Sequence, residues 1–408
     1  MKTFITLALL GACSFSLPAL AGSQTLLAAA DDDLVVTRLS LAKAATPAGV
    51  ERAPVDFVWA LDPAQALTKP STYRAESREF WTELDATQLR KGHRFQTTAA
   101  GALVRLSPLD AGKAAALTLD DVSLRIDGRS VATAKAVKVS ADAAQLREAG
   151  VDFSAGTVVF QLAPELAPGN IELSAKAASG RYLLHVYEPT SPIALDLQAD
   201  RDRALAGGSV VLHAQWQAGT DAVAPRSLGG LLTSPQGYSQ SIKFVRTRDG
   251  SYQATVHLPE YADTGMALWE VHSFGVAQSK GALVARDAKT SFSVSQPTAR
   301  LDGQAQTRIS KAQGLSVKLG VEASSAGRYE LRGVLYGSDA NGELKPFAMA
   351  HAARWLEPGV GHITLDYGDL ARQAGMRAPF ELRDLQLNDQ ARMGQLETRA
   401  RALRFAAD

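Results

Sequence analysis

The stretch that decides the fold is SVVLHAQW, residues 209–216. Apolar side chains take every second position along it: Val210, Leu212, Ala214 and Trp216. Because successive side chains of a strand point to opposite faces, this period of two predicts a β-strand with one buried face. SYQATVHL, residues 251–258, has the same period, with Tyr252 and Leu258 at its two inward-facing ends. The pair predicts a sheet that packs on a second apolar layer.

Similar stretches extend in both directions from this pair. They alternate with turn signals, of which Asp127-Gly128 and Asn341-Gly342 are the strongest because both residue types tolerate a positive φ. One helix is expected after Asp85, which forms a capping box with Gln88, and Gly92 would end it. The sequence therefore predicts a mainly β fold of tandem immunoglobulin-like β-sandwich domains, the first with added short helices.

Changes in the residue pattern along the chain predict the limits of its domains. Residues 1–21 have the character of a signal peptide, and residues 22–50 that of a flexible N-terminal segment. A mixed, mostly β domain is expected over 51–189. Two further sandwiches are expected over 190–296 and 297–408, each of a length that suits seven or more short strands.

The first 21 residues carry two competing signals. Lys2 precedes an apolar run that is too short to span a bilayer, and Ala19-Leu20-Ala21 offers small residues for cleavage between Ala21 and Gly22. The run LLGAC instead resembles a lipobox that would make Cys13 a lipid anchor. Cleavage after Ala21 fits better, because Cys13 comes very early. We expect a periplasmic or secreted protein, with a membrane-anchored lipoprotein as the alternative.

Charge and cysteine content exclude several classes of function. The chain has 43 basic and 42 acidic residues, and the first 21 residues hold one basic residue, Lys2, so their removal leaves a formal net charge of zero. A nucleic-acid surface needs a basic stripe that displaces counterions, and none is visible. Cys13 is the single cysteine. Cleavage would therefore exclude disulfides and thiol chemistry from the mature chain.

No stretch forms a recognised catalytic or cofactor motif, so we expect a non-enzymatic protein without a cofactor. One metal hypothesis arises from three residues: Glu270 and His272 share a strand face and, with His257 from a neighbouring strand, would give two imidazoles and a carboxylate. Separate surface residues are the preferred interpretation. Asp200 and Asp202 are a second metal hypothesis, for calcium, and the arginines beside them favour local ion pairs instead.

Tryptophans offer the remaining candidate surface. Trp216 and Trp269 fall on faces expected to be buried, so they are assigned to the core. Trp59 and Trp81 lie in the irregular first domain and are the weak candidates for an exposed binding surface.

Three segments resemble a known family. They are YRAESREFWTELDATQLRKGHRFQTTAAGALVRLSP (73–108), RYLLHVYEPTSP (181–192) and PFELRDLQLNDQARMG (379–394). They are similar to exported gammaproteobacterial proteins of unknown function that are built of immunoglobulin-like domains. The shared motifs are structural, so the resemblance implies export and tandem sandwiches, and it brings no catalytic residues.

Together these observations favour an exported protein that acts by binding, with another envelope, secreted or host-surface protein as partner. Two alternatives stay open. One is a carbohydrate-binding module that uses Trp59 and Trp81. The other is a metal-dependent enzyme with an unrecognised site, for which His257, Glu270 and His272 are the candidates.

Overall fold

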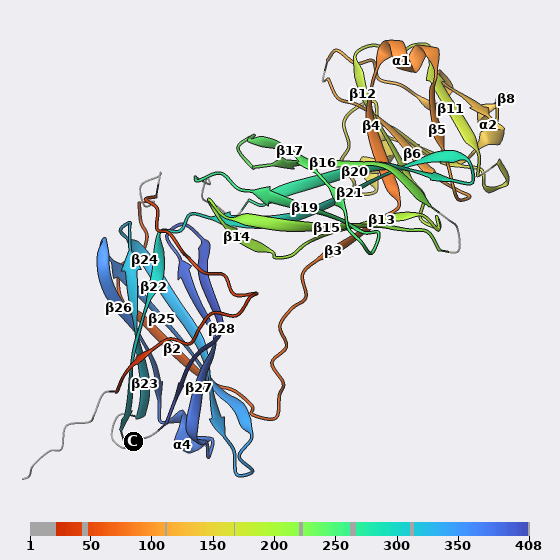
Figure 1. Cartoon of the computed structure of the whole chain (residues 1–408). Coiled ribbons are helices and arrows are strands. Elements are labelled where there is room, and N and C mark those ends of the chain that lie inside the picture. Colours follow the sequence, from red (N-terminus) through yellow and green to blue (C-terminus); the bar gives the residue numbers. More distant parts are fainter. Residues whose placement is uncertain are drawn as a thin grey trace, which may run out of the picture. The chain divides into compact units, whose positions relative to one another are not determined.

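The protein is mainly antiparallel β-structure with a few short helices, as the sequence predicted (Figure 1). The computed structural model describes residues 22–42, 48–110, 112–166, 168–219, 223–261, 267–310 and 314–406. Contacts between residues divide the chain into two compact units. We call Pro70–Val294 the central unit. The terminal unit joins the described residues up to Lys69 with those from Ser295 onward.

Two antiparallel sheets form the terminal unit. One has the strand order β1 (Gly22–Thr25), β22 (Ala299–Ser310), β23 (Gly314–Ala323), β26 (Gly359–Gly368). The other has the order β2 (Val55–Ala60), β25 (Leu344–Leu356), β24 (Gly327–Ser338), β27 (Arg377–Asp389), β28 (Gly394–Phe405). A short helix, α4 (Leu370–Gln373), precedes β27. Alternate residues of β23, such as Val317 and Leu319, are buried, as the period of two predicted.

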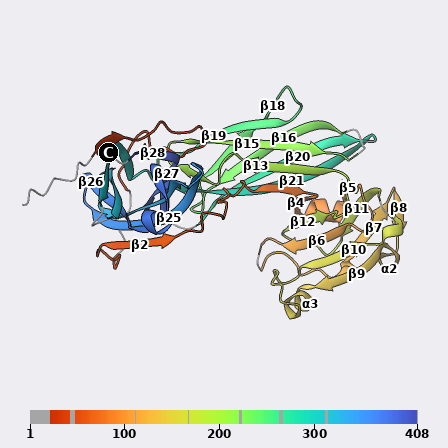
Figure 2. The ribbon, with the colours of Figure 1, turned by 90° about the horizontal axis from the view of Figure 1, so that it is seen from below.

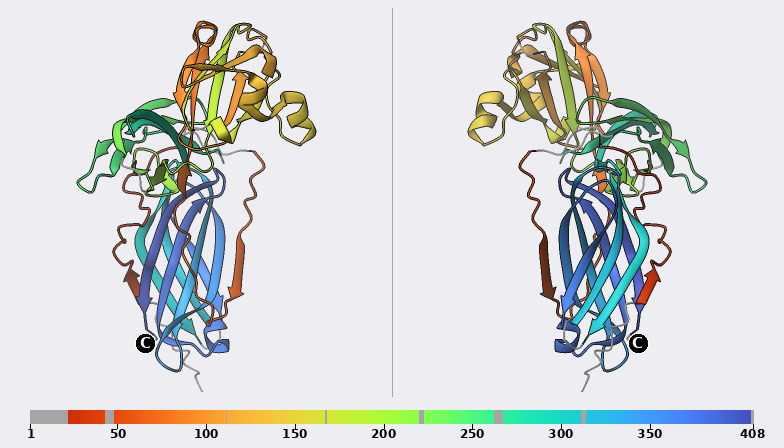
Figure 3. Two further views of the ribbon diagram at one scale, coloured as in Figure 1. Left: turned by 90° about the vertical axis from the view of Figure 1, so that its right-hand side faces the viewer. Right: turned by 90° about the vertical axis from the view of Figure 1, so that its left-hand side faces the viewer.

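The N-terminal residues of this unit differ from the expectation. Residues 22–50 were predicted to be flexible and residues from 51 onward to open the first domain. Instead β1 pairs with β22 and β2 with β25, both in the terminal unit. Figure 3 shows these red and orange strands at the flanks of the blue ones. A short strand such as VDFVWA reveals its own period, but its sequence does not identify the sheet that it joins.

The central unit contains three sheets. The largest has the order β17 (Ser239–Lys243), β16 (Ala224–Thr233), β20 (Trp269–Ser279), β21 (Ala282–Ser295), β4 (Glu79–Asp85), β12 (Arg181–Tyr187), β6 (Leu103–Pro108), β10 (Val158–Leu162), β9 (Val137–Asp142), with β14 (Arg203–Leu205) beside β21. The second has the order β18 (Val245–Arg246), β19 (Tyr252–His257), β15 (Ser209–Gln217), β13 (Ala194–Ala199), β3 (Arg74–Ser77). The third has the order β5 (His93–Gln96), β11 (Asn170–Ala175), β7 (Val122–Ile126), β8 (Arg129–Val131).

These sheets enclose two apolar cores. The first lies in the lobe of residues 79–187 and contains Leu84, Phe160 and Tyr182. Figure 2 shows β6, β10 and β9 of this lobe side by side. The second core lies between the sheet of β15 and that of β20, where Leu212 and Trp269 are buried. The inward faces predicted for 209–216 and 251–258 are confirmed at their buried central residues, while Trp216 and Tyr252 are only partly buried and pack against this core.

Local signals set the helices and turns of the central unit. The helices are α1 (Ala86–Lys91), α2 (Thr133–Ala136), α3 (Ala143–Glu148) and the single turns η1 (Leu119–Asp121) and η2 (Pro164–Leu166). The capping box of α1 is present, because the Asp85 carboxylate accepts the Gln88 N–H while the Gln88 side chain accepts the Asp85 N–H. Asp127-Gly128 makes the β7–β8 turn with φ of 49° and 77°. In the terminal unit, Asn341-Gly342 lies in a longer connection between β24 and β25.

Candidate functional site

Strand β2 exposes apolar side chains along a free edge of the terminal unit. It is the first strand of its sheet and, among the residues that the structure describes, it pairs with β25 alone. Phe57, Val58 and Trp59 are 55%, 42% and 44% exposed. Natural sheet edges usually carry charges, prolines or bulges that discourage pairing with another chain. We call Phe57, Val58 and Trp59 the β2 edge, and it is the most prominent apolar run on the described surface.

The two aromatic rings of the β2 edge form a small platform. The ring centroids of Phe57 and Trp59 are 5.8 Å apart, with an interplanar angle of 27°. Both rings contact the imidazole of His351, at 6.1 and 6.4 Å between centroids. His351 stands opposite Phe57 on β25. Its Nε2 lies 3.2 Å from a carboxylate oxygen of Glu330 on β24, so polar groups border the platform.

Polar contacts fix β2 to its neighbour. The Arg354 guanidinium donates to both carboxylate oxygens of Asp56, at 2.7 and 2.8 Å, and to the backbone oxygen of Val55 at 3.1 Å. Hydrogen bonds between charged groups are shorter and stronger than those between neutral groups. The apolar side chains of the β2 edge are therefore held in position without being packed into a core.

Trp81, the other predicted surface tryptophan, lies in the central unit and its ring is covered. It stacks on His272 with centroids 4.5 Å apart and an interplanar angle of 23°. His185 contacts it edge-on at 6.1 Å, and the Lys289 ammonium lies 5.0 Å from its ring centroid. The predicted pair of Trp59 and Trp81 therefore belongs to two separate units, and Trp59 with Phe57 is the better exposed pair.

Each histidine beside Trp81 pairs with a carboxylate. His185 Nε2 lies 2.7 Å from an oxygen of Glu79, and His272 Nε2 lies 3.2 Å from one of Asp287. The hydrogen bond with His185 holds the pKa of Glu79 below its usual value. These pairs connect β4, β12, β20 and β21 across the place where the two lobes of the central unit share one sheet.

The metal site considered for His257, Glu270 and His272 does not form. β19 and β20 belong to opposite sheets of the sandwich, and both place these residues on the outer faces, because their neighbours Val256 and Val271 are buried. Glu270 pairs instead with Lys289 at 2.8 Å. Within the described part of the chain, no group of three or more His, Cys, Asp or Glu side chains is placed to hold a metal.

Asp200 and Asp202 likewise show no shared site. The Asp200 carboxylate accepts the backbone N–H of Val211 at 2.9 Å and pairs with Arg201 at 3.0 Å. The local ion pairing preferred from the sequence is thus present for Asp200. Asp202 contributes its backbone oxygen to Ser293.

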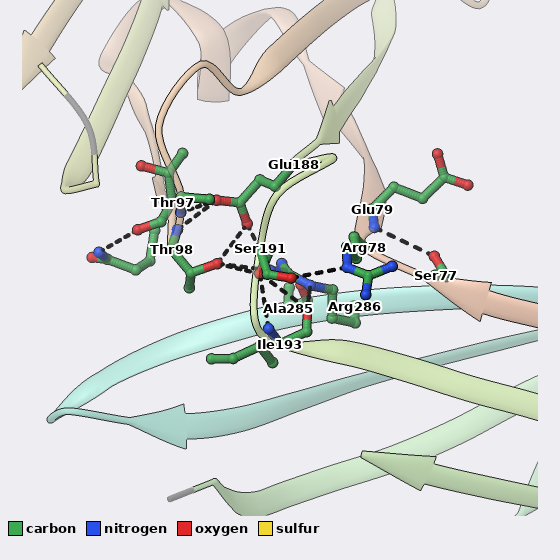
Figure 4. Close-up of polar contacts among 12 residues, drawn as sticks. Ser77, Arg78, Glu79, Thr97, Thr98, Glu188, Ser191, Ile193, Ala285 and Arg286 are labelled. Atoms are coloured by element: carbon green, nitrogen blue, oxygen red, sulfur yellow. Dashed lines mark hydrogen bonds and ion pairs between the residues drawn. The ribbon is translucent and has the colours of Figure 1, made fainter. Parts of the chain in front are cut away.

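A buried polar network joins the two lobes of the central unit, and no sequence signal indicated it. Figure 4 shows Arg286 of β21 among Glu188, Ser191, Thr98 and Ile193. Its Nη2 donates to Glu188 at 2.6 Å, to Ser191 at 2.8 Å and to Thr98 at 2.9 Å, and its Nε donates to the Ile193 oxygen at 2.9 Å. The Arg286 and Glu188 side chains are both 0% exposed. The network therefore satisfies both buried charges with protein partners.

The predicted export signals occupy the first 21 residues. Cys13 and Ala21 lie outside the described residues, and Gly22 is the first residue of β1. Among the described residues, no helix has the length and apolar character needed to cross a membrane.

Comparison with known proteins places the chain in a family. The DUF4785 N-terminal domain, a domain of unknown function, matches residues 46–188, and the DUF4785 C-terminal domain matches residues 298–406. No curated protein matches the sequence. Membership of a family of unknown function, expected from the sequence, is thus confirmed, while export and immunoglobulin-like domains stay predictions.

One solved structure shares the fold of this chain. A DUF4785 family protein from Legionella pneumophila shares 18% identity over 91% of this chain and 98% of its own, with a TM-score of 0.73, which shows a common fold. The match to trypsin activated alpha-2-macroglobulin from Escherichia coli takes in 77% of this chain and 22% of that protein, at 14% identity. Its TM-score of 0.21 is too low to show a shared fold. The two family matches together take in more than half of the sequence, so the chain belongs to the DUF4785 family.

Proposed function

We propose that this protein is an exported, non-enzymatic binding protein that recognises a partner protein at the β2 edge. The observation that carries the proposal is the run of exposed Phe57, Val58 and Trp59 on a strand with one free side. Such a strand can accept an extended segment of another chain, whose backbone completes the hydrogen bonds of the edge. Pockets between alternate side chains then provide specificity.

Export is part of the proposal and rests on residues 1–21. Cleavage between Ala21 and Gly22 would release the protein to the periplasm or the medium, whereas lipidation of Cys13 would attach it to a membrane. An intact mass of the product made in a Gram-negative host distinguishes the two. A soluble species that begins at Gly22 supports free export, and a heavier membrane-bound species that begins at Cys13 supports the lipoprotein. Full-length, uncleaved protein in the cytoplasm would contradict export.

In-cell photo-crosslinking tests the β2 edge. Benzoylphenylalanine replaces Val58 in the full chain, and a matched control carries it at Val360, an exposed residue of β26 in the same unit. We expect one discrete adduct from position 58 that position 360 does not give. Mass spectrometry of the adduct should map the crosslink to an extended segment of the partner.

Binding of a peptide to the purified chain is the second test of the β2 edge. A peptide with the mapped sequence should bind the purified chain, and Val58→Lys should weaken binding at least about tenfold because a charged edge opposes strand addition. Val360→Lys is the control and should leave the affinity unchanged. Equal adducts from both positions, or peptide binding that Val58→Lys does not affect, would contradict the proposal.

A carbohydrate-binding function is the second candidate, and the stacked rings of Phe57 and Trp59 favour it. Aromatic faces bind sugar rings, and the His351 imidazole borders both rings. On a glycan array, retention lost in Trp59→Ala but kept in Trp355→Ala would support this function. Retention that survives Trp59→Ala would exclude the platform as the sugar site.

A further inference from the structure

A polar hollow of the terminal unit is lined by residues outside the β2 strand. Its volume is about 520 Å³, and its wall comes from the β24–β25 connection, from the start of β27 and from the end of β28. Arg377 and Arg404 line it, together with Ser338, Leu344 and Pro379. This volume lies in the range of small-molecule sites in proteins.

Positive charge exceeds negative charge beside this hollow. Glu381, whose carboxylate is buried, stands opposite Arg404 on the neighbouring strand. One Glu381 oxygen accepts from Arg383 at 2.8 Å, and the other accepts from Arg401 at 2.9 Å. Burial opposes ionisation of Glu381, but these two arginines hold its pKa below the usual value. The single Glu381 carboxylate is thus already hydrogen-bonded to two guanidiniums, those of Arg383 and Arg401, and Arg404 is a third guanidinium beside it.

Arg404 and Arg377 retain hydrogen-bonding capacity. Arg404 Nε lies 3.8 Å from Glu381, which is beyond hydrogen-bond distance, and its side chain is 56% exposed. Among the described residues, the Arg377 guanidinium has no hydrogen-bond acceptor or ion-pair partner, and the residue is exposed. Two guanidiniums with free N–H groups therefore border one hollow.

The Asp339 carboxylate also lines the hollow, and it accepts hydrogen bonds from the backbone. Asp339 Oδ1 accepts the backbone N–H groups of Asn341 and Glu343, each at 2.9 Å, and so closes the β24–β25 connection. Glu343 pairs with Lys345 at 2.7 Å. Neither acid is bonded to Arg377 or Arg404, and the donors of those two arginines stay available to a ligand.

We propose that this hollow, which we call the Arg377–Arg404 hollow, binds a small molecule through an oxyanion group, a phosphate or a carboxylate. The planar fork of a guanidinium matches two oxygens of either group. Leu344 and Pro379 would contact the apolar body of the ligand. The proposal is independent of the β2 edge, because it uses other strands and other residues.

Calorimetric titration of the purified full chain tests the hollow. Inorganic phosphate and succinate are used as separate probes at constant ionic strength, so that the two kinds of oxyanion are distinguished. We expect Arg377→Gln and Arg404→Gln each to weaken binding of the preferred probe about tenfold or more, because each removes charge-assisted hydrogen bonds. Arg372→Gln is the matched control, since this exposed arginine of α4 pairs with Asp369, the residue before the helix, and the variant should bind the probe with unchanged affinity.

The titration results either support or contradict the proposed oxyanion site. Binding of either probe that depends on both Arg377 and Arg404 supports the hollow and names its preferred group. Binding of neither probe at millimolar concentration would overturn it, as would equal weakening by Arg372→Gln. Urea unfolding should give wild-type stability for both arginine variants, because both guanidiniums are exposed. Val58→Lys should leave the titration unchanged, so failure here is separable from failure at the β2 edge.

Discussion

Two regions of the molecule reverse the usual distribution of residues. At the joint between the lobes of the central unit, Arg286 and Glu188 are charged and fully buried. At the β2 edge, Phe57, Val58 and Trp59 are apolar and exposed. Buried charge costs desolvation, and exposed apolar surface forgoes burial, so each arrangement gives up stability that the more common one would keep.

The Arg286 joint and the β2 edge differ in whether their groups remain available to a partner. Every polar group named around Arg286 has a partner in the chain, so the joint is closed and offers no free bond to a ligand. The β2 edge has apolar faces and one unpaired side, and both remain available. Changes at the joint should therefore alter stability, and changes at the edge should alter binding.

The largest effect is expected from Arg286→Met. It leaves the Glu188 carboxylate buried without its cation, and such losses cost about 3–5 kcal/mol of unfolding free energy. Urea unfolding followed by circular dichroism measures it. Arg201→Met is the control, because its partner Asp200 lies at the surface, and its expected cost is below about 1 kcal/mol. A cost below about 1 kcal/mol for Arg286→Met would contradict the stabilising role assigned to the buried joint.

A paired replacement sharpens the same point. In Arg286→Met with Glu188→Leu, no charge is left buried, so the double variant should be more stable than Arg286→Met alone, by about 1–3 kcal/mol. A double-mutant cycle on the same unfolding data gives the coupling. Additive losses from the two single variants would show that the side chains do not act as a pair.

An intermediate effect is expected from Glu79, because its carboxylate is only partly buried. Its pKa is lowered by the hydrogen bond with His185, so its stabilisation is present above the unfolded value, about 4.3. It is lost as the pH falls through the folded value. Glu79→Gln should cost no more than about 1 kcal/mol at pH 7.

Unfolding titrations at pH 7 and at pH 3 measure this dependence. The gap between wild type and Glu79→Gln should shrink as the pH falls through the lowered pKa of Glu79, because the wild-type carboxylate then becomes protonated. Glu83→Gln is the control on the same strand, since Glu83 is exposed and pairs with exposed Arg181. A gap that stays constant with pH would show that ionisation of Glu79 does not contribute.

The smallest effect on stability is expected at the β2 edge. Phe57→Thr and Trp59→Thr keep β-propensity and remove exposed rings, so the unfolding free energy should change by no more than about 0.5 kcal/mol. Binding of the partner peptide or of glycans should nevertheless fall. A loss of stability as large as that of Arg286→Met would show that these rings form part of the core, and the contrast between the two regions would disappear.

The sequence predicted much of the local structure. Alternation in 209–216 and 251–258 placed Leu212 and Val256 on buried faces, and the capping box placed the start of α1. These features depend on residues close together in the chain, whose geometry follows from the period of a strand or from the free N–H groups of a helix end. Exposure of Trp59 was also predicted, although Phe57 was missed within the same short run.

Long-range placement was not predictable in the same way. The sequence suggested that His257 and His272 stand on neighbouring strands, but β19 and β20 lie in opposite sheets. It likewise gave no sign that β2 joins β25, nearly 300 residues later, or that Arg286 meets Glu188. The sequence by itself determined which residues turn inward and where strands end, because those are properties of the neighbouring chain. Only the tertiary structure decided which strands pair and which charges meet, because many sheets can bury the same alternating faces.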